Sequence, residues 1–236
     1  MVEPRDQNEP AAQADDQAAG KEPGRGGEPA MSGSIEALLK ERMRLDEELS
    51  RTYSRRITVM FTDIKGSTSF FERRGDIEGR IMVERHNSLL FPIIEAHGGA
   101  VIKTIGDAIM AKFEQAEQAV LAAMAMQRRL AEDNRQRETR DQIHIRVGVN
   151  TGLGIVEKND VFGDVVNVAA RVESLCDPDQ ILLSAATFAE VRNSEDIICR
   201  AHKEATVRGK EEALKVYRVL WAPEEELLVT SERTRG

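Results

Sequence analysis

Cysteine is scarce in this sequence of 236 residues, and no familiar metal-binding pattern of cysteine or histidine occurs in it. Cys176 and Cys199 are its two cysteines, and neither belongs to a Cys-x-x-Cys pair. This argues against a disulfide framework and a thiolate zinc site, and it fits a reducing cytosol. The four histidines form no His-Glu-x-x-His or His-x-x-x-His pattern. We interpret them as ordinary surface or partly buried residues.

Long apolar runs are also missing. The longest, Ala119–Met126, has eight residues and lies within a helical pattern. A membrane-spanning helix needs roughly 18 or more. The N-terminus is acidic and lacks the apolar segment of a secretory signal. These absences predict a soluble cytoplasmic protein with no membrane span.

Basic residues are too few to balance the acidic ones. The sequence has 33 Lys and Arg against 41 Asp and Glu, a formal net charge of −8. Nucleic acid is held chiefly by neutralising its phosphates, so this total argues against a nucleic-acid partner. The excess lies mainly at the ends, with −4 in residues 1–33 and −2 in residues 223–236. Residues 34–222 carry only −2, which leaves room for a polyanionic small molecule.

Composition divides the chain into four parts. Residues 1–33 hold four of the seven prolines and five glycines, and we expect this acidic tail to be disordered because it has little apolar surface to bury. Residues 34–54 are expected to form one amphipathic helix. Residues 55–222 would form the folded domain, and residues 223–236 a flexible C-terminal tail.

The apolar residues of the 34–54 segment follow a heptad-like spacing. Ile35, Leu38, Leu45 and Leu49 fall on one face of the expected helix. Such a face can pair with its copy as a short coiled coil or pack on its own domain, and the pattern leaves both open.

The rest of the chain alternates between strand and helix patterns. The expected strands are Ile57–Phe61, Val101–Ile105, Ala108–Phe113, Ile143–Asn150, Gln180–Ser184 and Leu214–Leu220. The expected helices are Ile77–Ala96, Ala116–Arg137, Val165–Leu175 and Ala185–Arg192. This order predicts an α+β fold with a ferredoxin-like βαββαβ core, an extra C-terminal helix and strands, and helices on one face of the sheet.

The first segment with chemical potential follows the first strand. The strand ends in Asp63, a turn of Gly66, Ser67 and Thr68 comes next, and a helix begins near Ser69. Backbone N–H groups at such a turn form an anion site, and a carboxylate beside them suits Mg²⁺ bridging to phosphate. The alternative is that the Asp and Ser side chains merely cap a helix.

Asp107 is the second candidate, at the tip of the hairpin expected between residues 101 and 113. If that hairpin lies beside the first strand, Asp107 approaches Asp63. Two carboxylates in one site repel unless cations lie between them, and two divalent ions about 3.5–4 Å apart would activate an in-line displacement at phosphorus. The alternative is an ordinary Asp in a turn.

The third candidate is a polar pair on an otherwise apolar helix. Asn167 and Arg171 are four residues apart and therefore share a face. Arg binds phosphate oxygens bidentately, so this face suits a nucleotide. A structural Arg–Asp pair is the alternative.

Together the three segments resemble the catalytic domain of class III nucleotidyl cyclases, of the adenylate cyclase type. The resemblance runs from about Arg56 to Val219, with the motifs in the family's order. It implies the class III cyclase fold for residues 55–222. It also implies two Mg²⁺ or Mn²⁺ ions in each active site, held by Asp63, Asp107 and the Ile64 carbonyl.

The resemblance also implies which base is read. Lys103 and Asp160 match the family's purine-reading pair, in which Lys donates to adenine N1 and Asp accepts from the exocyclic amine. Guanine reverses both groups, and family members that use GTP carry Glu in place of Lys103 and usually Cys or Ser in place of Asp160. Because a mismatched base would leave buried polar groups unpaired, we expect the substrate to be ATP.

The remaining roles come from the same resemblance. Asn167 would orient the ribose, and Arg171 would stabilise charge at the transferring phosphorus. The implied contacts to the triphosphate are Lys210, Arg146 and the turn of Gly66, Ser67 and Thr68. For Lys210 and Arg146, solvated surface charge is the alternative.

The resemblance implies conversion of ATP to 3′,5′-cyclic AMP and pyrophosphate, by attack of the ribose 3′-hydroxyl on the α-phosphate. In the family, metal and purine residues of one site come from different subunits, so this chain is expected to form a homodimer with two composite sites. Many family members have a longer arm where this chain has residues 155–159, and that arm grips the partner subunit. The short arm therefore bears on the dimer contacts and not on the chemistry.

One alternative is a catalytically silent nucleotide-binding module of this fold. A diguanylate cyclase is disfavoured because Ala100 follows Gly98 and Gly99, where a GGDEF signature would continue with Asp.

Overall fold

The computed structural model describes residues 34–158, 160–202 and 214–222. The two expected tails and Lys210 lie outside these residues. The chain divides between Met43 and Arg44 into two units, so the N-terminal helix is described by itself. Among the described helices, none is long and apolar enough to cross a membrane.

Helix α1 (Ile35–Tyr53) occupies the segment in which an amphipathic helix was expected. Where the structure describes its side chains, Ile35, Leu38 and Leu45 are exposed. An ion pair between Glu36 and Lys40, 3.0 Å apart and one turn along the helix, supports its first half. Pairing of this helix with its copy stays a prediction.

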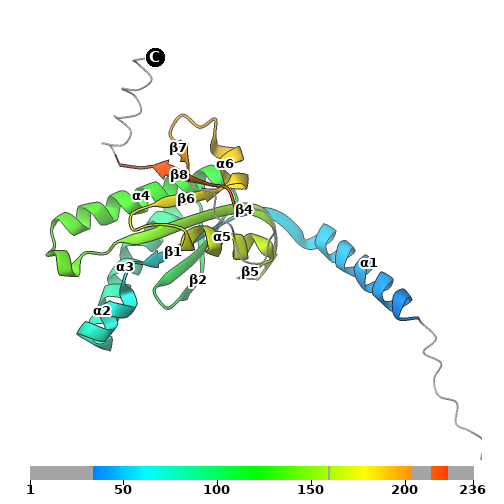
Figure 1. The fold of residues 1–236 in the computed structure, drawn as a ribbon, viewed down its shortest axis with the longest axis horizontal. Coiled ribbons are helices and arrows are strands. Elements are labelled where there is room, and N and C mark those ends of the chain that lie inside the picture. Colours follow the sequence, from blue (N-terminus) through cyan, green and yellow to red (C-terminus); the bar gives the residue numbers. More distant parts are fainter. Residues whose placement is uncertain (1–33, 159, 203–213, 223–236) are drawn as a thin grey trace, which may run out of the picture. The chain divides into compact units, whose positions relative to one another are not determined.

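One mixed sheet organises the described part of the domain (Figure 1). Its strands are β1 (Ser54–Ile64), β2 (Ala100–Ile105), β3 (Ala108–Phe113), β4 (Ile145–Glu157), β5 (Asp160–Phe162), β6 (Ile181–Ser184), β7 (Ile198–Ala201) and β8 (Val216–Leu220). They lie in the order β2-β3-β1-β4-β6-β8-β7, and β5 pairs with β4. The pair β4–β6 is parallel, and the other pairs are antiparallel.

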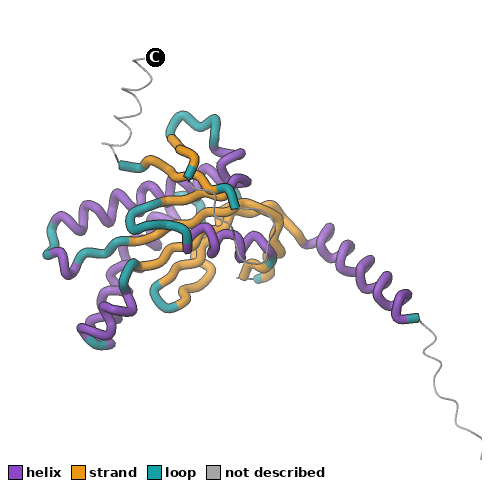
Figure 2. The backbone as a smooth tube through the Cα atoms, in the orientation of Figure 1, coloured by secondary structure: helices purple, strands orange, loops and turns teal. Residues whose placement is uncertain are grey.

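Helices connect these strands, as the tube in Figure 2 shows. They are α2 (Ser67–Arg74), α3 (Asp76–Ala96), α4 (Ala116–Arg135), the short 3₁₀ helix η1 (Thr139–Asp141), α5 (Asp164–Ser174) and α6 (Ala185–Val191). Strands β1 to β4 with their helices form the βαββαβ core, in the spatial order β2-β3-β1-β4. The predicted α+β, ferredoxin-like fold class is therefore confirmed. Strands β1 and β4 are longer than expected, and β5 and β7 were not expected at all.

The two faces of the sheet carry different helices, because successive residues of a strand point to opposite sides. Met60 and Ile64 of β1 belong to the core that contains buried residues of α3 and α4. Val59 and Phe61 point the other way and pack with Val165 of α5. The expectation that the helices cover one face is therefore wrong: α5 covers the second face.

Glycine on β4 lets α5 come close to the sheet. A Cβ on Gly148 would lie 2.1 Å from the backbone nitrogen of Glu173 on α5. The buried side-chain amide of Asn150, two residues along the same face, donates to the Val165 carbonyl at 2.9 Å. These contacts fix α5 against β4, and they thereby also position the α5 residues that do not face the sheet.

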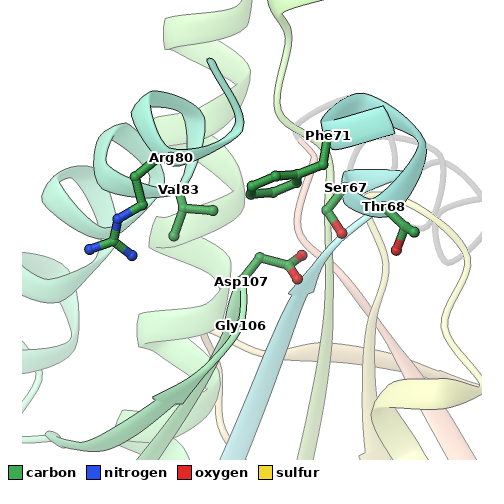
Figure 3. A pocket seen from close by; sticks show the side chains of 7 residues that line it. All are labelled: Ser67, Thr68, Phe71, Arg80, Val83, Gly106 and Asp107. Carbon is green, nitrogen blue, oxygen red and sulfur yellow. The ribbon is translucent and has the colours of Figure 1, made fainter. Parts of the chain in front are cut away.

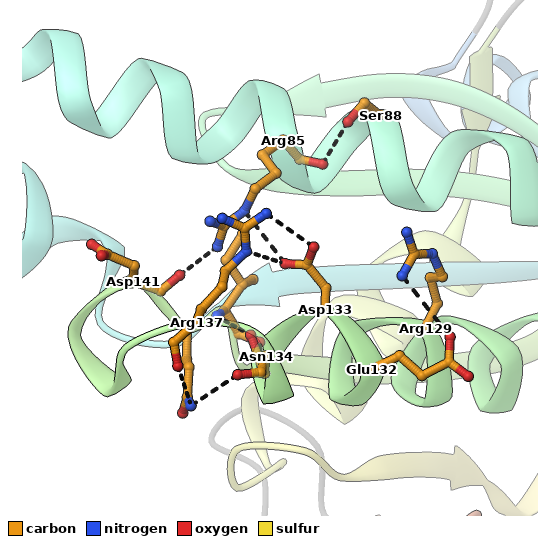
Figure 4. A network of polar contacts seen from close by, with 10 residues as sticks. Arg85, Ser88, Arg129, Glu132, Asp133, Asn134, Arg137 and Asp141 are labelled. Carbon is orange, nitrogen blue, oxygen red and sulfur yellow. Dashed lines mark hydrogen bonds and ion pairs between the residues drawn. The ribbon is translucent and has the colours of Figure 1, made fainter.

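A polar network joins the helices on the opposite face (Figure 4). Arg137 donates to both carboxylate oxygens of Asp133, at 2.6 and 3.1 Å, and this contact holds the pKa of Asp133 below its usual value. Arg85 of α3 donates to the Asp141 carbonyl at 2.5 Å. Arg74, at the end of α2, donates to the Asp141 carboxylate at 2.9 Å. The network therefore ties α2 and α3 to the segment that leads into β4.

Candidate active site

Asp107 lies at the tip of the β2–β3 hairpin, beside the end of β1. The pairing of β3 with β1 sets Ile109 opposite Thr62, as the hairpin hypothesis required. The Ile64 N–H then donates to Asp107 Oδ2 at 3.1 Å. Since Ile64 directly follows Asp63, the two aspartates meet at one edge of the sheet.

The turn after β1 is built on glycine. Gly66 has φ 76°, a left-handed conformation that glycine adopts without a steric cost. It is the N-cap of α2, and no side chain caps that helix. The alternative that Asp63 and Ser67 serve as helix caps is therefore wrong. Backbone N–H groups of this turn are available to an anion.

A pocket of about 410 Å³ opens next to this turn (Figure 3). It is lined by Ser67, Thr68, Phe71, Arg80, Val83, Gly106 and Asp107. The pocket therefore places the hydroxyl groups of the turn and the Asp107 carboxylate around one cavity. Phosphate oxygens and their counter-cations are the ligands that suit such a lining.

Arg146 lies between two carboxylates at the same edge. It sits directly opposite Asp63 in the β1–β4 register, and its Nη2 donates to Asp63 Oδ2. Its Nε lies 3.0 Å from Glu173 Oε1. Arg146 was expected at phosphate, and this contact with Asp63 was not foreseen. The sequence analysis did not identify Glu173 as a site residue. The signal that could have pointed to it is Gly148, because glycine at that position allows α5 to approach β4.

Burial and neighbouring charge shift the ionisation of this cluster. Burial raises the pKa of Glu173 to about 7, the charges of Asp63 and Asp107 add to the rise, and Arg146 opposes it. Burial alone would lower the pKa of Arg146, but its hydrogen bond to Asp63 and the charge of Glu173 outweigh this, so that pKa is raised. Arg146 therefore stays charged.

The donor atoms at this edge suit a hard divalent cation. Asp63 and Asp107 offer carboxylate oxygens and Ile64 offers a carbonyl oxygen, the ligand types that Mg²⁺ and Mn²⁺ prefer. Asp63 already attracts a cation, the Arg146 guanidinium. Across residues 34–158, 160–202 and 214–222, no group of three or more His, Cys, Asp or Glu side chains is arranged to hold a metal. Phosphate oxygens would have to complete the coordination.

Lys103 and Asp160, the expected purine-reading residues, contact each other. Lys103 Nζ on β2 lies 2.7 and 2.9 Å from the two carboxylate oxygens of Asp160 on β5. The hydrogen bond from Lys103, followed by one from the Val161 N–H, lowers the pKa of Asp160. Asp160 is therefore an anion at neutral pH. A donor and an acceptor thus lie side by side on a partly exposed surface.

Asn167 and Arg171 lie on the side of α5 that faces away from the sheet. The helix buries Val165, Ala169 and Val172. At 100° per residue, Asn167 lies about 165° and Arg171 about 125° around the helix from the centre of that buried stripe. Asn167 is exposed and Arg171 is half-buried. Their side chains are thus directed away from the sheet.

The site residues form three groups. The first contains Asp63, Ile64, Asp107, the turn and Arg146; the second is Lys103 with Asp160; the third is Asn167 with Arg171. Among the described residues, no hydrogen bond or ion pair joins one group to another.

His86 differs from what the sequence suggested. Its side chain is fully buried on α3, whereas the histidines were interpreted as surface or partly buried residues. Burial lowers its pKa to about 4, so the ring is neutral at pH 7. Its Nδ1 lies 3.1 Å from Asn87 Oδ1.

Comparison with known proteins identifies relatives. Residues 49–220, more than half of the chain, match the sequence model described as "Adenylate and Guanylate cyclase catalytic domain". A "Putative adenylate cyclase 3" of Rhizobium meliloti is 36% identical over 139 residues, which is 59% of this chain and 24% of that protein. An "Adenylate cyclase" of Anabaena cylindrica is 31% identical over 191 residues, 73% of this chain and 38% of that protein. The chain thus spans well under half the length of these relatives.

A solved structure agrees with the sequence matches. The adenylyl cyclase CyaB from P. aeruginosa superposes with a TM-score of 0.65 at 25% identity. The alignment covers 73% of this chain and 97% of that one. The shared part is therefore the folded domain described above.

Proposed function

Because the chain belongs to the family of adenylate and guanylate cyclase catalytic domains, we propose that it is an adenylate cyclase. It converts ATP to 3′,5′-cyclic AMP and pyrophosphate. A nucleotide is the substrate class that the family supports, and the choice of ATP over GTP is the finer part of the proposal.

The contact between Lys103 and Asp160 carries that choice. A lysine can only donate, and an ionised carboxylate can only accept. Adenine presents an acceptor at N1 and a donor at its amine, which matches both groups, whereas guanine presents the reverse. The two side chains already lie within 2.7–2.9 Å of each other, close enough to meet the two neighbouring edge atoms of one base.

The chain's own groups would bind and orient the polyphosphate. N–H groups of the turn after β1 receive its oxygens, and Arg146 and Lys210 add positive charge. Asn167 orients the ribose, and Arg171 stabilises charge as it develops at the α-phosphorus. Divalent cations held by Asp63 and Asp107 would lower the pKa of the ribose 3′-hydroxyl and would neutralise negative charge on the phosphates.

The geometry of the reaction explains why no side-chain nucleophile is required. The 3′-hydroxyl and the α-phosphorus belong to one molecule, so holding the ribose and the triphosphate in an attack geometry supplies much of the acceleration. Positioning residues such as Asn167 and the turn therefore matter as much as the groups that stabilise charge.

A homodimer with two composite sites is part of the proposal. Asn167 and Arg171 are directed away from their own sheet, and among residues 34–158, 160–202 and 214–222 no hydrogen bond or ion pair links them to Asp63 or Asp107. A second copy that covers α5 would bring its own Asp63 and Asp107 to them. Each dimer would then contain two equivalent sites.

The direct test is an assay of the purified full chain with ATP or GTP, in Mg²⁺ or Mn²⁺. We expect cyclic AMP and pyrophosphate in equal amounts from ATP, and at least 100-fold less cyclic GMP from GTP. ATP binding without any cyclic AMP in Mn²⁺ would favour the silent nucleotide-binding module instead. Preferential formation of cyclic GMP would overturn the choice of ATP.

A further inference from the structure

Arg146 is bonded to the carboxylate of Asp63, which the proposed function assigns to a metal ion. Its guanidinium donates to Asp63 Oδ2 and also lies 3.0 Å from Glu173 Oε1. Strand register fixes the first contact, because Arg146 and Asp63 are direct partners on β4 and β1. The close approach of α5 over Gly148 fixes the second. The arrangement is therefore set by the backbone.

Little water screens this cluster. The side chains of Arg146, Asp63 and Glu173 are 22%, 25% and 14% exposed. Charges interact more strongly in such a setting than on the open surface. A second cation cannot join the same Asp63 oxygen without strong repulsion from the guanidinium, and the carboxylate has few other directions open to solvent.

Arg146 has two alternative acceptors when it leaves Asp63. Glu173 is already in contact with it, and a polyphosphate bound at the turn after β1 would offer paired oxygens that match the guanidinium. The guanidinium can therefore move without becoming an unpaired buried charge. Glu173 keeps it within reach of the site during that move.

From this geometry we infer that Arg146 competes with the divalent cation for Asp63. In the protein without metal the guanidinium holds the carboxylate, and the cation binds only as Arg146 shifts towards Glu173 or the polyphosphate. Glu173 is the positioning residue for that shift. The inference rests on the proposed function in one respect, which is the assignment of Asp63 as a cation ligand.

Binding of Mn²⁺ to the nucleotide-free protein tests the competition without any measurement of activity. The free Mn²⁺ is followed by its electron paramagnetic resonance signal, with the full chain at pH 8 so that Glu173 is ionised. In Arg146→Gln, the competitor is removed and the neighbouring carboxylates remain. We expect this variant to bind Mn²⁺ about tenfold more tightly than the wild type.

Lys65→Gln is the matched control. Lys65 is an exposed cation two residues from Asp63, and its side chain forms no ion pair with that carboxylate, whose partner is Arg146. Its removal lowers the local positive charge by the same amount, so we expect its Mn²⁺ affinity to stay within about twofold of the wild type. An equal gain in both variants would show a general charge effect, and it would overturn the competition.

A double-mutant cycle tests the role of Glu173. Glu173→Gln leaves Arg146 with Asp63 alone, so Mn²⁺ binding should weaken several-fold in the wild-type background and change little in the Arg146→Gln background. An equal effect in both backgrounds would mean that Glu173 acts on the cation directly, and it would overturn its role as a positioning residue. If Arg146→Gln does not fold, unchanged or tighter Mn²⁺ binding in Glu173→Gln alone would overturn that role.

Asp63→Asn distinguishes a failure of the competition from a failure of the proposed function. If this variant binds Mn²⁺ as the wild type does, the metal role of Asp63 in the proposed function is wrong, and the competition falls with it. If Asp63→Asn loses Mn²⁺ but Arg146→Gln gains nothing, the competition alone is overturned and the proposed function stands.

Discussion

Lys103 on β2 holds Asp160 on β5 through both carboxylate oxygens, at 2.7 and 2.9 Å. The two strands are far apart in the sheet order, so the contact exists because the β4–β5 hairpin brings Asp160 over to β2. Strand β5 pairs with residues 155–157 of β4, which belong to the short arm of residues 155–159. The shortness of this arm therefore does not prevent the contact between Lys103 and Asp160.

Reversing the donor and acceptor of this pair should change the base that is accepted. In Lys103→Glu combined with Asp160→Cys, the groups that match adenine are replaced by groups that suit guanine. We expect cyclic AMP formation to fall at least 100-fold and cyclic GMP to become the main product. The measurement is product formation from ATP and GTP at saturating Mn²⁺.

The single variant Asp160→Asn is the matched control for this switch. It keeps the size of the side chain, removes the charge and replaces one acceptor oxygen by an NH₂ donor. It should lose ATP turnover and gain none with GTP, and its melting temperature should be unchanged because the pair lies on an exposed surface. A double variant that stays selective for ATP would show that other residues read the base.

Composite sites predict recovery of activity when two inactive variants are mixed. Asp107→Ala damages the proposed cation-binding residues Asp63 and Asp107, here the metal group, and Lys103→Glu damages the proposed base-reading pair Lys103 and Asp160, here the purine group. In a mixed dimer one site carries both lesions and the other carries neither. With free exchange of subunits, about a quarter of the sites should be intact, so the mixture should regain up to about a quarter of wild-type activity.

The control for the mixing experiment uses two lesions in the same group. Asp107→Ala mixed with Asp63→Ala leaves every metal group damaged, so no recovery is expected at any ratio. Recovery in this control, or none with Asp107→Ala and Lys103→Glu, would contradict sites shared between two copies.

Close packing of α5 on β4 makes a prediction about stability. Gly148→Ala places a Cβ 2.1 Å from the Glu173 backbone nitrogen, so the helix or the strand must shift. We expect the free energy of unfolding to fall by about 1–3 kcal/mol. Gly152→Ala, whose Cβ would meet Val165 at 3.4 Å, should change it by no more than about 0.5 kcal/mol. Thermal or urea unfolding of both variants provides the measurement, and equal stability would show that α5 is free to move.

These contacts mark the limit of what the sequence could predict. The positions of Asp63 and Asp107 follow from local signals, a strand that ends in a carboxylate and a turn between two apolar runs. The pairing of Asp63 with Arg146 depends on the register of β1 against β4, strands separated by about 80 residues of sequence. The alternating hydrophobic pattern decides which face of the sheet each residue takes, but no hairpin turn joins β1 to β4, so no local signal fixes which residues pair.

The same limit applies to Glu173 and to the second face of the sheet. The apolar spacing of α5 indicates which of its sides is buried, but it does not tell which face of the sheet that side meets. Gly148 allows the close approach on one face, and its meaning is clear only when the partner helix is known. Likewise the short strand β5 has only three residues, too few for a recognisable alternation.

The raised pKa of Glu173 predicts how the stability of the metal-free protein depends on pH. Burial raises this pKa from 4.5 to about 7, so the folded protein keeps a proton that the unfolded chain releases. The free energy of unfolding should therefore decrease as pH rises from about 4.5 to about 7. Glu173→Gln cannot ionise, and its stability should depend less on pH across that window. Identical pH profiles for the two proteins, measured by urea unfolding in EDTA, would contradict the shift.

The exposed apolar face of α1 gives the final prediction. Ile35, Leu38 and Leu45 are 80%, 56% and 46% exposed, which leaves apolar area that a parallel copy of the helix would bury. Because α1 ends at Tyr53 and β1 begins at Ser54, deletion of residues 1–53 removes the helix and leaves the first strand intact. If the helix pairs with its copy, this deletion should weaken dimerisation about tenfold in sedimentation experiments. Specific activity should fall at low protein concentration and recover as the concentration rises. Deletion of residues 1–33 alone is the control and should change neither property, whereas unchanged dimerisation and activity after the longer deletion would contradict the pairing.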